Sequence, residues 1–138
     1  KFKIKKKVFS FLNKKTAERK ILDFLKKNKV KLICLAGFMK ILSKNFIKKF
    51  DGKILNIHPS LLPRYKGLNT HHRVIKNNEK FSGCTVHFVN SKLDSGKIIM
   101  QKRVKVCKKD NASTLAKKIL KKEHVLYPQA IKKIFSNL

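Results

Sequence analysis

Acidic residues are scarce in this sequence of 138 residues, which has 7 Asp and Glu against 36 Lys and Arg and a formal net charge of +29. A basic surface collects phosphate groups, so nucleic-acid binding is one interpretation of this imbalance. The lysines, however, are spread through every segment, whereas dedicated nucleic-acid binders more often cluster arginines with exposed aromatic residues. The pattern therefore favours compositional drift, and we expect no nucleic-acid partner. A positive field still suits small anionic substrates.

Cysteine is also rare, and the spacing of Cys34, Cys84 and Cys107 leaves no C-x-x-C pair. An odd number of distant cysteines speaks against a disulfide framework or a zinc site and fits a reducing compartment. No apolar run approaches the roughly eighteen residues of a membrane span. No apolar core with a cleavage site follows the basic N-terminus either. We therefore expect a cytoplasmic protein without a membrane partner.

Hydrophobic spacing along the chain predicts helices that alternate with strands in one domain. Helices are expected at residues 16–28, 43–50, 70–77 and 114–135, and strands at residues 31–36, 53–57, 83–89 and 97–106. The apolar run at 32–36 is typical of a parallel strand buried on both faces, whereas the last two strands alternate in polarity. This order predicts an α/β fold with a mostly parallel sheet, an antiparallel C-terminal part and a long C-terminal helix that Pro128 kinks or divides.

The most informative motif is the unbroken run NIHPSLLP at residues 56–63, which stands where a predicted buried strand must stop. Side chains two residues apart on an extended chain share a side, so Asn56 and His58 are expected to face one cleft. In α/β sheets, sites lie beyond the carboxyl ends of strands. A carboxylate, Asp94, follows on a predicted turn at residues 93–96 (LDSG).

These three side chains have the chemistry needed for acyl transfer to or from a nitrogen. The amide of Asn56 can donate to an oxygen that becomes negative in a tetrahedral transition state. His58, as imidazolium, can stabilise that oxygen or pass a proton to the leaving nitrogen, and Asp94 would favour its protonated form and hold its orientation. Taken alone, Asp94 would read as a turn former and His58 as a structural histidine. The sequence therefore predicts catalytic roles from the combination rather than from any one residue.

Several segments resemble the phosphoribosylglycinamide formyltransferase family in order and spacing, from about Asn13 to the C-terminus. They are residues 36–42 (AGFMKIL), 56–63 (NIHPSLLP), 67–71 (GLNTH), 86–88 (VHF) and 93–96 (LDSG). The resemblance implies a Rossmann-like formyltransferase fold. It also implies transfer of the formyl group of 10-formyltetrahydrofolate to the amine of glycinamide ribonucleotide in de novo purine biosynthesis, without a metal. The catalytic triad would be Asn56, His58 and Asp94.

The resemblance also implies binding residues, in which the backbone and side chains of residues 39–42 line the folate pocket and residues 90–94 form its opposite wall. The implied folate-binding residues are Lys14, Met39, Lys40, Ile41, Leu42, Asn56, Asn90, Leu93 and Asp94. Glu123 matches an acidic position near the ribose of the substrate. Lys14 and Lys40 stand where the family has arginine, and lysine keeps the charge but loses the planar, bidentate contacts of a guanidinium group.

Glycine is too sparse here for one part of the family pattern, a glycine-rich loop after the first strand that binds the substrate phosphate through backbone N–H groups. The chain has 5 glycines, none precedes Asn13, and the sequence opens at Lys1 in the middle of an alternating pattern. We therefore expect residues 1–138 to form a single catalytic domain that is N-terminally incomplete. Such a chain would expose a strand edge and would be inactive alone unless another chain supplied the phosphate site.

Three alternatives stay open. Another folate-dependent formyltransferase, or formyltetrahydrofolate deformylase, would share the triad and differ in the acceptor, although Pro59 favours the glycinamide enzyme within this group. A basic RNA-binding module is the alternative from a different class. A metal site built from His58, His71, His72 and His87 is not expected, because no metal-ligand spacing supports it.

Overall fold

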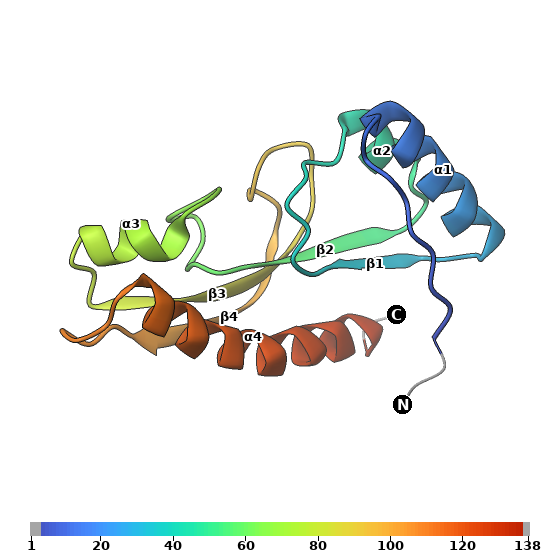
Figure 1. Cartoon of the computed structure of the whole chain (residues 1–138). Coiled ribbons are helices and arrows are strands. Elements are labelled where there is room, and N and C mark those ends of the chain that lie inside the picture. Colours follow the sequence, from blue (N-terminus) through green and yellow to red (C-terminus); the bar gives the residue numbers. More distant parts are fainter. Residues whose placement is uncertain (1–3, 137–138) are drawn as a thin grey trace.

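Eight elements follow one another in the computed structural model, which describes residues 4–136 (Figure 1). They are α1 (Lys14–Lys27), β1 (Leu32–Leu35), α2 (Lys44–Lys49), β2 (Lys53–His58), α3 (Thr70–Lys76), β3 (Phe81–Phe88), β4 (Ile98–Lys105) and α4 (Ala112–Phe135). Each predicted helix and strand is confirmed, with small shifts at the ends. The predicted domain range extends over residues 1–3 and 137–138, which lie outside the described residues.

The four strands form one mixed sheet in the order β1-β2-β3-β4. Only β1 and β2 pair in parallel, while β2 with β3 and β3 with β4 are antiparallel. The prediction of a mostly parallel sheet is therefore wrong for the described residues, and the antiparallel C-terminal part is confirmed. Thr85 of β3 stands opposite His58, the last residue of β2, and Phe88 stands opposite Leu55. The chain therefore enters β3 near the end of β2 and runs back.

The long helix α4 covers one face of the sheet (Figure 1). Its apolar side chains pack with inward residues of β3, and this cluster includes Cys84, Val86, Leu115, Ile119 and Leu126. The helix begins with a capping box, in which the side chain of Asn111 accepts from the Thr114 backbone and the Thr114 hydroxyl accepts in return. This packing fixes the strands that carry the candidate site.

Helices α1 and α2 pack together at one end of the sheet, over a second apolar cluster that contains Phe46, Phe50 and Ile54. Side chains alternate along β2, so Ile54, Asn56 and His58 share one face of the strand, while Ile57 packs into the α4 cluster. Asn56 and His58 therefore lie on a strand whose apolar residues pack into both clusters.

Strand β1 differs from its prediction, since it lies at the edge of the described sheet and is not buried on both faces. Leu32, Ile33 and Leu35 are half-buried, and Cys34 is exposed. Among residues 4–136, β1 pairs only with β2. An apolar run reports how much a strand could bury, but it does not report the position of the strand in the sheet.

Pro128 lies inside α4 and does not divide it, so that part of the prediction is wrong. A proline removes the hydrogen bond that its own N–H would donate to the carbonyl of residue 124. His124 and Pro128 are both exposed, so water can reach the carbonyl that is left without a donor. A proline on the outer side of a helix is therefore tolerated here.

Candidate active site

A cleft of about 890 Å³ opens beyond the carboxyl ends of β1 and β2, with the first half of α4 along one side. Ten of the eleven predicted site residues line it: Met39, Lys40, Ile41, Leu42, Asn56, His58, Asn90, Leu93, Asp94 and Glu123. The exception is Lys14, which lies on α1 in the groove between α1 and α2, with its ammonium group 4.0 Å from the Glu18 carboxylate. Lys14 therefore lies apart from the other ten predicted site residues.

Asn56 and His58 lie in the last three residues of β2, and Pro59 follows directly after the strand. In the antiparallel register, Asn56 stands opposite His87 and His58 opposite Thr85, so these four side chains share one face of the sheet. His58 is 6% exposed. The strand thus delivers an amide and an imidazole to the same wall of the cleft.

Asp94 reaches this wall from the turn between β3 and β4. Its Oδ2 lies 3.4 Å from His58 Nδ1, both side chains are 8% exposed, and the same oxygen accepts a 2.9 Å hydrogen bond from the Gly67 backbone. The turn closes tightly at Gly96, where an added Cβ would lie 1.7 Å from the Phe88 carbonyl oxygen. Only glycine fits this approach, which explains why the LDSG turn presents its aspartate in this place.

The second nitrogen of His58 is also engaged. Nε2 lies 2.9 Å from the carbonyl oxygen of Tyr65, and a carbonyl can only accept, so Nε2 carries a hydrogen. Because the Asp94 carboxylate faces Nδ1, both ring nitrogens face oxygen acceptors. These two contacts fix the plane of the imidazole within the wall of the cleft.

His87 lines the same cleft, although the sequence pointed to it only as a metal ligand that was not expected. It is 2% exposed, and its Nδ1 donates to the Phe88 carbonyl oxygen at 2.8 Å. Burial is the main cause that lowers the pKa of His87, so the ring is neutral and Nε2 is an acceptor. Nε2 lies 3.4 Å from Asn56 Nδ2. One N–H of the Asn56 amide is thereby held on the sheet, and the other is left for a ligand.

Two further titratable groups in the cleft are shifted by burial. The pKa of His71 is lowered by burial and by the neighbouring His72 and His58, and its Nδ1 is buried without a hydrogen-bond partner among the described residues. Burial raises the pKa of Glu123, with His124 acting in the opposite direction. The alternation of side chains along β3 is the sequence signal that could have placed His87 on the same face as Asn56. No sequence signal placed His71 in the cleft.

The cleft also has an unusually exposed apolar wall. Met39, Ile41, Leu68 and Leu93 are between 51% and 73% exposed, on three loops that flank the candidate catalytic residues. Residues 36–42 of this wall lie outside the regular elements, so their backbone groups are free to bind a ligand. A flat, partly apolar ligand with polar edges fits such walls.

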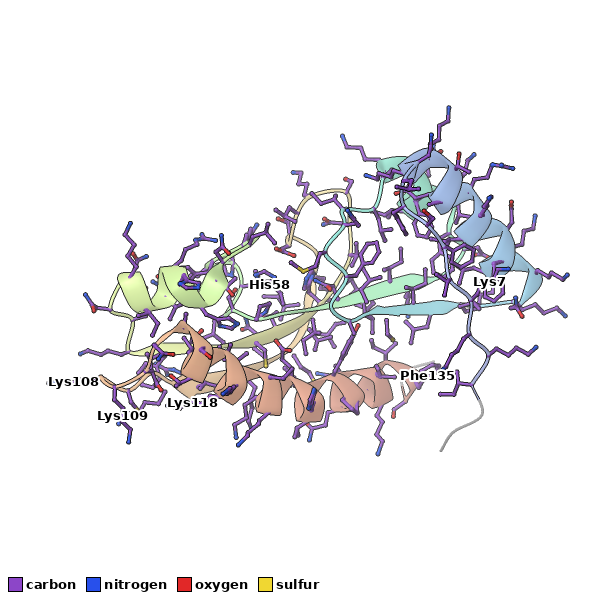
Figure 2. All side chains as sticks on the ribbon, viewed as in Figure 1. Lys7, His58, Lys108, Lys109, Lys118 and Phe135 are labelled. Carbon is purple, nitrogen blue, oxygen red and sulfur yellow. The ribbon has the colours of Figure 1, made fainter. Side chains whose placement is uncertain are left out.

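The charge and metal predictions can be compared with the described residues. The labelled lysines lie at opposite ends of the molecule, with Lys7 far from Lys108 and Lys109, so basic residues are not confined to one patch (Figure 2). Within residues 4–136, no three His, Cys, Asp or Glu side chains gather as a metal site would require. In the same range, no helix combines the length and the apolar character that crossing a membrane would demand.

Comparisons with known proteins identify the family. Residues 1–131 match the family described as Formyl transferase. A phosphoribosylglycinamide formyltransferase of Haemophilus influenzae is 44% identical over 123 residues, which are 89% of this chain and 58% of that protein. The trifunctional purine biosynthetic protein adenosine-3 of Gallus gallus is 50% identical over 107 residues, which are 78% of this chain and 11% of that protein.

A solved structure agrees with these matches. The crystal structure of phosphoribosylglycinamide formyltransferase from Brucella melitensis is 48% identical and superposes with a TM-score of 0.83, over 90% of this chain and 64% of that chain. The chain thus spans less than two thirds of the length of each of these relatives. Because the family match covers nearly all of its residues and the fold agrees, the chain belongs to the formyl transferase family.

Proposed function

We propose that this chain carries the site that transfers the formyl group of 10-formyltetrahydrofolate to the amine of glycinamide ribonucleotide, a step of de novo purine biosynthesis. The observation that carries the proposal is the 3.4 Å approach of His58 Nδ1 to Asp94 Oδ2 beside the amide of Asn56. The names of the relatives favour this acceptor over the one of a deformylase, which would use water.

In the proposed reaction, the substrate amine attacks the formyl carbon and the carbonyl electron pair moves to oxygen. Asn56, with one N–H held by His87, donates the other to this oxyanion, and the His58 imidazolium stabilises it. When the intermediate collapses, the C–N bond to the folate nitrogen breaks. That nitrogen takes a proton from His58, and the attacking amine loses one through water to Asp94. The products are the formylated amine and the folate with an N–H, so protons and electrons balance.

The two loops of the cleft support a folate as the donor. Met39 and Leu42 would cover the face of its ring system, the free backbone groups of residues 39–42 would bind its polar edge, and residues 90–94 would close the opposite side. Lys40 would meet the acidic tail as a point charge, without the planar contacts of arginine. Bound there, the folate supplies the formyl group and the leaving nitrogen.

Glu123 is the residue proposed for the ribonucleotide side of the cleft. It comes from α4 and is half-buried. Burial raises the pKa of Glu123, so a hydrogen bond donated by a ribose hydroxyl would stabilise its charged form. No glycine-rich loop for the phosphate occurs in the sequence.

The test compares His58→Ala with Lys132→Ala, which removes an exposed side chain of α4 outside the cleft. With a stable 10-formyl folate and glycinamide ribonucleotide, His58→Ala should lose at least about a hundredfold of the transfer rate, because it loses the proton donor. Lys132→Ala should keep the wild-type rate. Formyl transfer that survives in His58→Ala would refute the proposal, and formate released without the amine would identify a deformylase.

A further inference from the structure

The loop between β2 and α3 holds a tyrosine in a conformation that tyrosine seldom adopts. Tyr65 has φ +56°, in the left-handed region, where the Cβ of an L residue crowds the backbone. Such conformations persist when the surroundings determine them, and they concentrate at functional sites. The contacts of this side chain therefore matter more than those of an ordinary loop residue.

The side chain of Tyr65 has partners at its ring and at its hydroxyl group. The guanidinium carbons of Arg64 and Arg73 lie 5.4 Å and 5.3 Å from the ring centroid. The hydroxyl group donates to Glu79 Oε1 at 2.6 Å and accepts from Asn77 Nδ2 at 2.9 Å. We call these five residues the Tyr65 clamp. The hydrogen bond from Tyr65 and the charge of Arg64 keep the pKa of Glu79 below its usual value, so the clamp contains a carboxylate.

The clamp is connected to the candidate site through the backbone. In the left-handed conformation, the carbonyl oxygen of Tyr65 lies 2.9 Å from His58 Nε2. Two residues later, the Gly67 N–H donates to Asp94 Oδ2, the oxygen that faces His58 Nδ1. One loop thus contacts the imidazole at one nitrogen and positions the carboxylate at the other.

We propose that Tyr65 is a positioning residue for His58: its clamped side chain keeps its carbonyl on Nε2, which sets the plane of the imidazole and leaves the Nδ1 side, with Asp94, for proton transfer. The role in turnover rests on the proposed function, whereas the hydrogen bond can be tested without it. Neither Tyr65 nor its clamp needs to touch a substrate for this role.

The kinetic test uses Tyr65→Gly, which accepts the left-handed backbone but removes the clamped ring. We expect kcat to fall about tenfold while KM for both substrates changes less than about twofold, because the binding walls are untouched. Tyr65→Phe keeps the ring contacts with Arg64 and Arg73 and should restore kcat to within about threefold of the wild type. The control is Asn78→Gly, at another positive-φ position (φ +49°) outside the cleft, which should leave kcat unchanged.

A second readout does not depend on turnover. The His58 Nε2 proton should give a low-field signal that is absent in His58→Ala, present in the wild type and in Tyr65→Phe, and broadened by solvent exchange in Tyr65→Gly. An unchanged signal in folded Tyr65→Gly would overturn the inference, as would an unchanged kcat. If the wild type transfers no formyl group but its signal responds as described, the proposed function fails and the positioning role stands.

Discussion

Among single residues, two buried histidines of the cleft differ in their contacts. The Nε2 of His58 lies 2.9 Å from the Tyr65 carbonyl oxygen, and its Nδ1 lies 3.4 Å from Asp94 Oδ2. The Nδ1 of His87 donates to the Phe88 carbonyl oxygen, and its Nε2 lies 3.4 Å from Asn56 Nδ2 and 3.7 Å from Asp94 Oδ1. Burial lowers the pKa of His87, which favours the neutral ring whose Nε2 accepts from Asn56.

The neutral state of His87 predicts a pH dependence of folding. Burial, with smaller lowering contributions from His58 and Lys66, outweighs the raising effects of the Phe88 carbonyl and Asp94, so the folded pKa lies below 6.5. At a pH above 6.5 His87 is neutral in both states and contributes nothing. As the pH falls below 6.5, the unfolded chain binds a proton first, and folding loses up to about 1.4 kcal/mol per pH unit.

This prediction is measured by urea unfolding of the wild type and His87→Gln between about pH 8 and pH 5. The variant is expected to show a shallower loss of unfolding free energy below pH 6.5. His71, also lowered, contributes equally to both proteins and drops out of the difference. His124→Gln, at an exposed position, should follow the wild-type slope. Parallel slopes for the wild type and His87→Gln would contradict a neutral, buried His87.

At the scale of elements, the junction of α1 and α2 depends on one buried carboxylate. Glu18, 6% exposed, accepts from the Ser43 backbone N–H at 2.8 Å and from the Ser43 hydroxyl, and Ser43 itself caps α2 by accepting from Phe46. The loop 37–42, which forms the apolar wall of the cleft, ends at this cap. The geometry of that wall therefore depends on α1.

Removing this carboxylate is expected to destabilise the fold. Glu18→Ala leaves the Ser43 N–H and hydroxyl without their partner in a half-buried place, which should lower the free energy of unfolding by about 1 kcal/mol. Asp23→Ala, on the exposed side of the same helix, is the control and should change it by less than about 0.5 kcal/mol. Equal unfolding midpoints for the two variants would show that the Glu18 contacts contribute nothing.

At this scale, the sequence predicts some features of the fold and of the candidate site and not others. Helix and strand positions follow from local spacing, and the approach of Asn56, His58 and Asp94 was expected because a strand end and a tight turn each place their side chains predictably. The mostly antiparallel sheet was not predicted, because local spacing does not report which way the connection of residues 59–80 returns the chain. The role of Tyr65 was missed as well, since a left-handed tyrosine is fixed by contacts with Arg73 and Glu79, which are distant in sequence.

At the scale of the whole molecule, the two edge strands of the described sheet differ in charge. Strand β4 carries Lys102, Arg103 and Lys105, charges that discourage pairing with another chain. Strand β1 has the sequence LICL and no charge, and among residues 4–136 it pairs on one side only. Against this exposed apolar edge stands the net charge of +29, which keeps copies of the chain apart.

The balance between edge pairing and charge repulsion predicts self-association that increases with salt. At low ionic strength the repulsion dominates, whereas at high salt the Debye length shrinks to about 3 Å and the β1 edge is free to pair. Under reducing conditions, sedimentation velocity should detect larger species as salt is raised. Cys34→Lys places a charge on the exposed position of β1 and should keep the chain monomeric.

Two controls separate the causes of this effect. Cys34→Ser removes the thiol without adding charge and should associate as the wild type does. Gln129→Lys adds the same charge at an exposed position of α4 and should also leave association unchanged, because it lies away from β1. If Cys34→Lys associates like Gln129→Lys at every salt concentration, then β1 is not the contact. Association that instead weakens with salt would mean that ion pairs, rather than the apolar edge, hold the copies together.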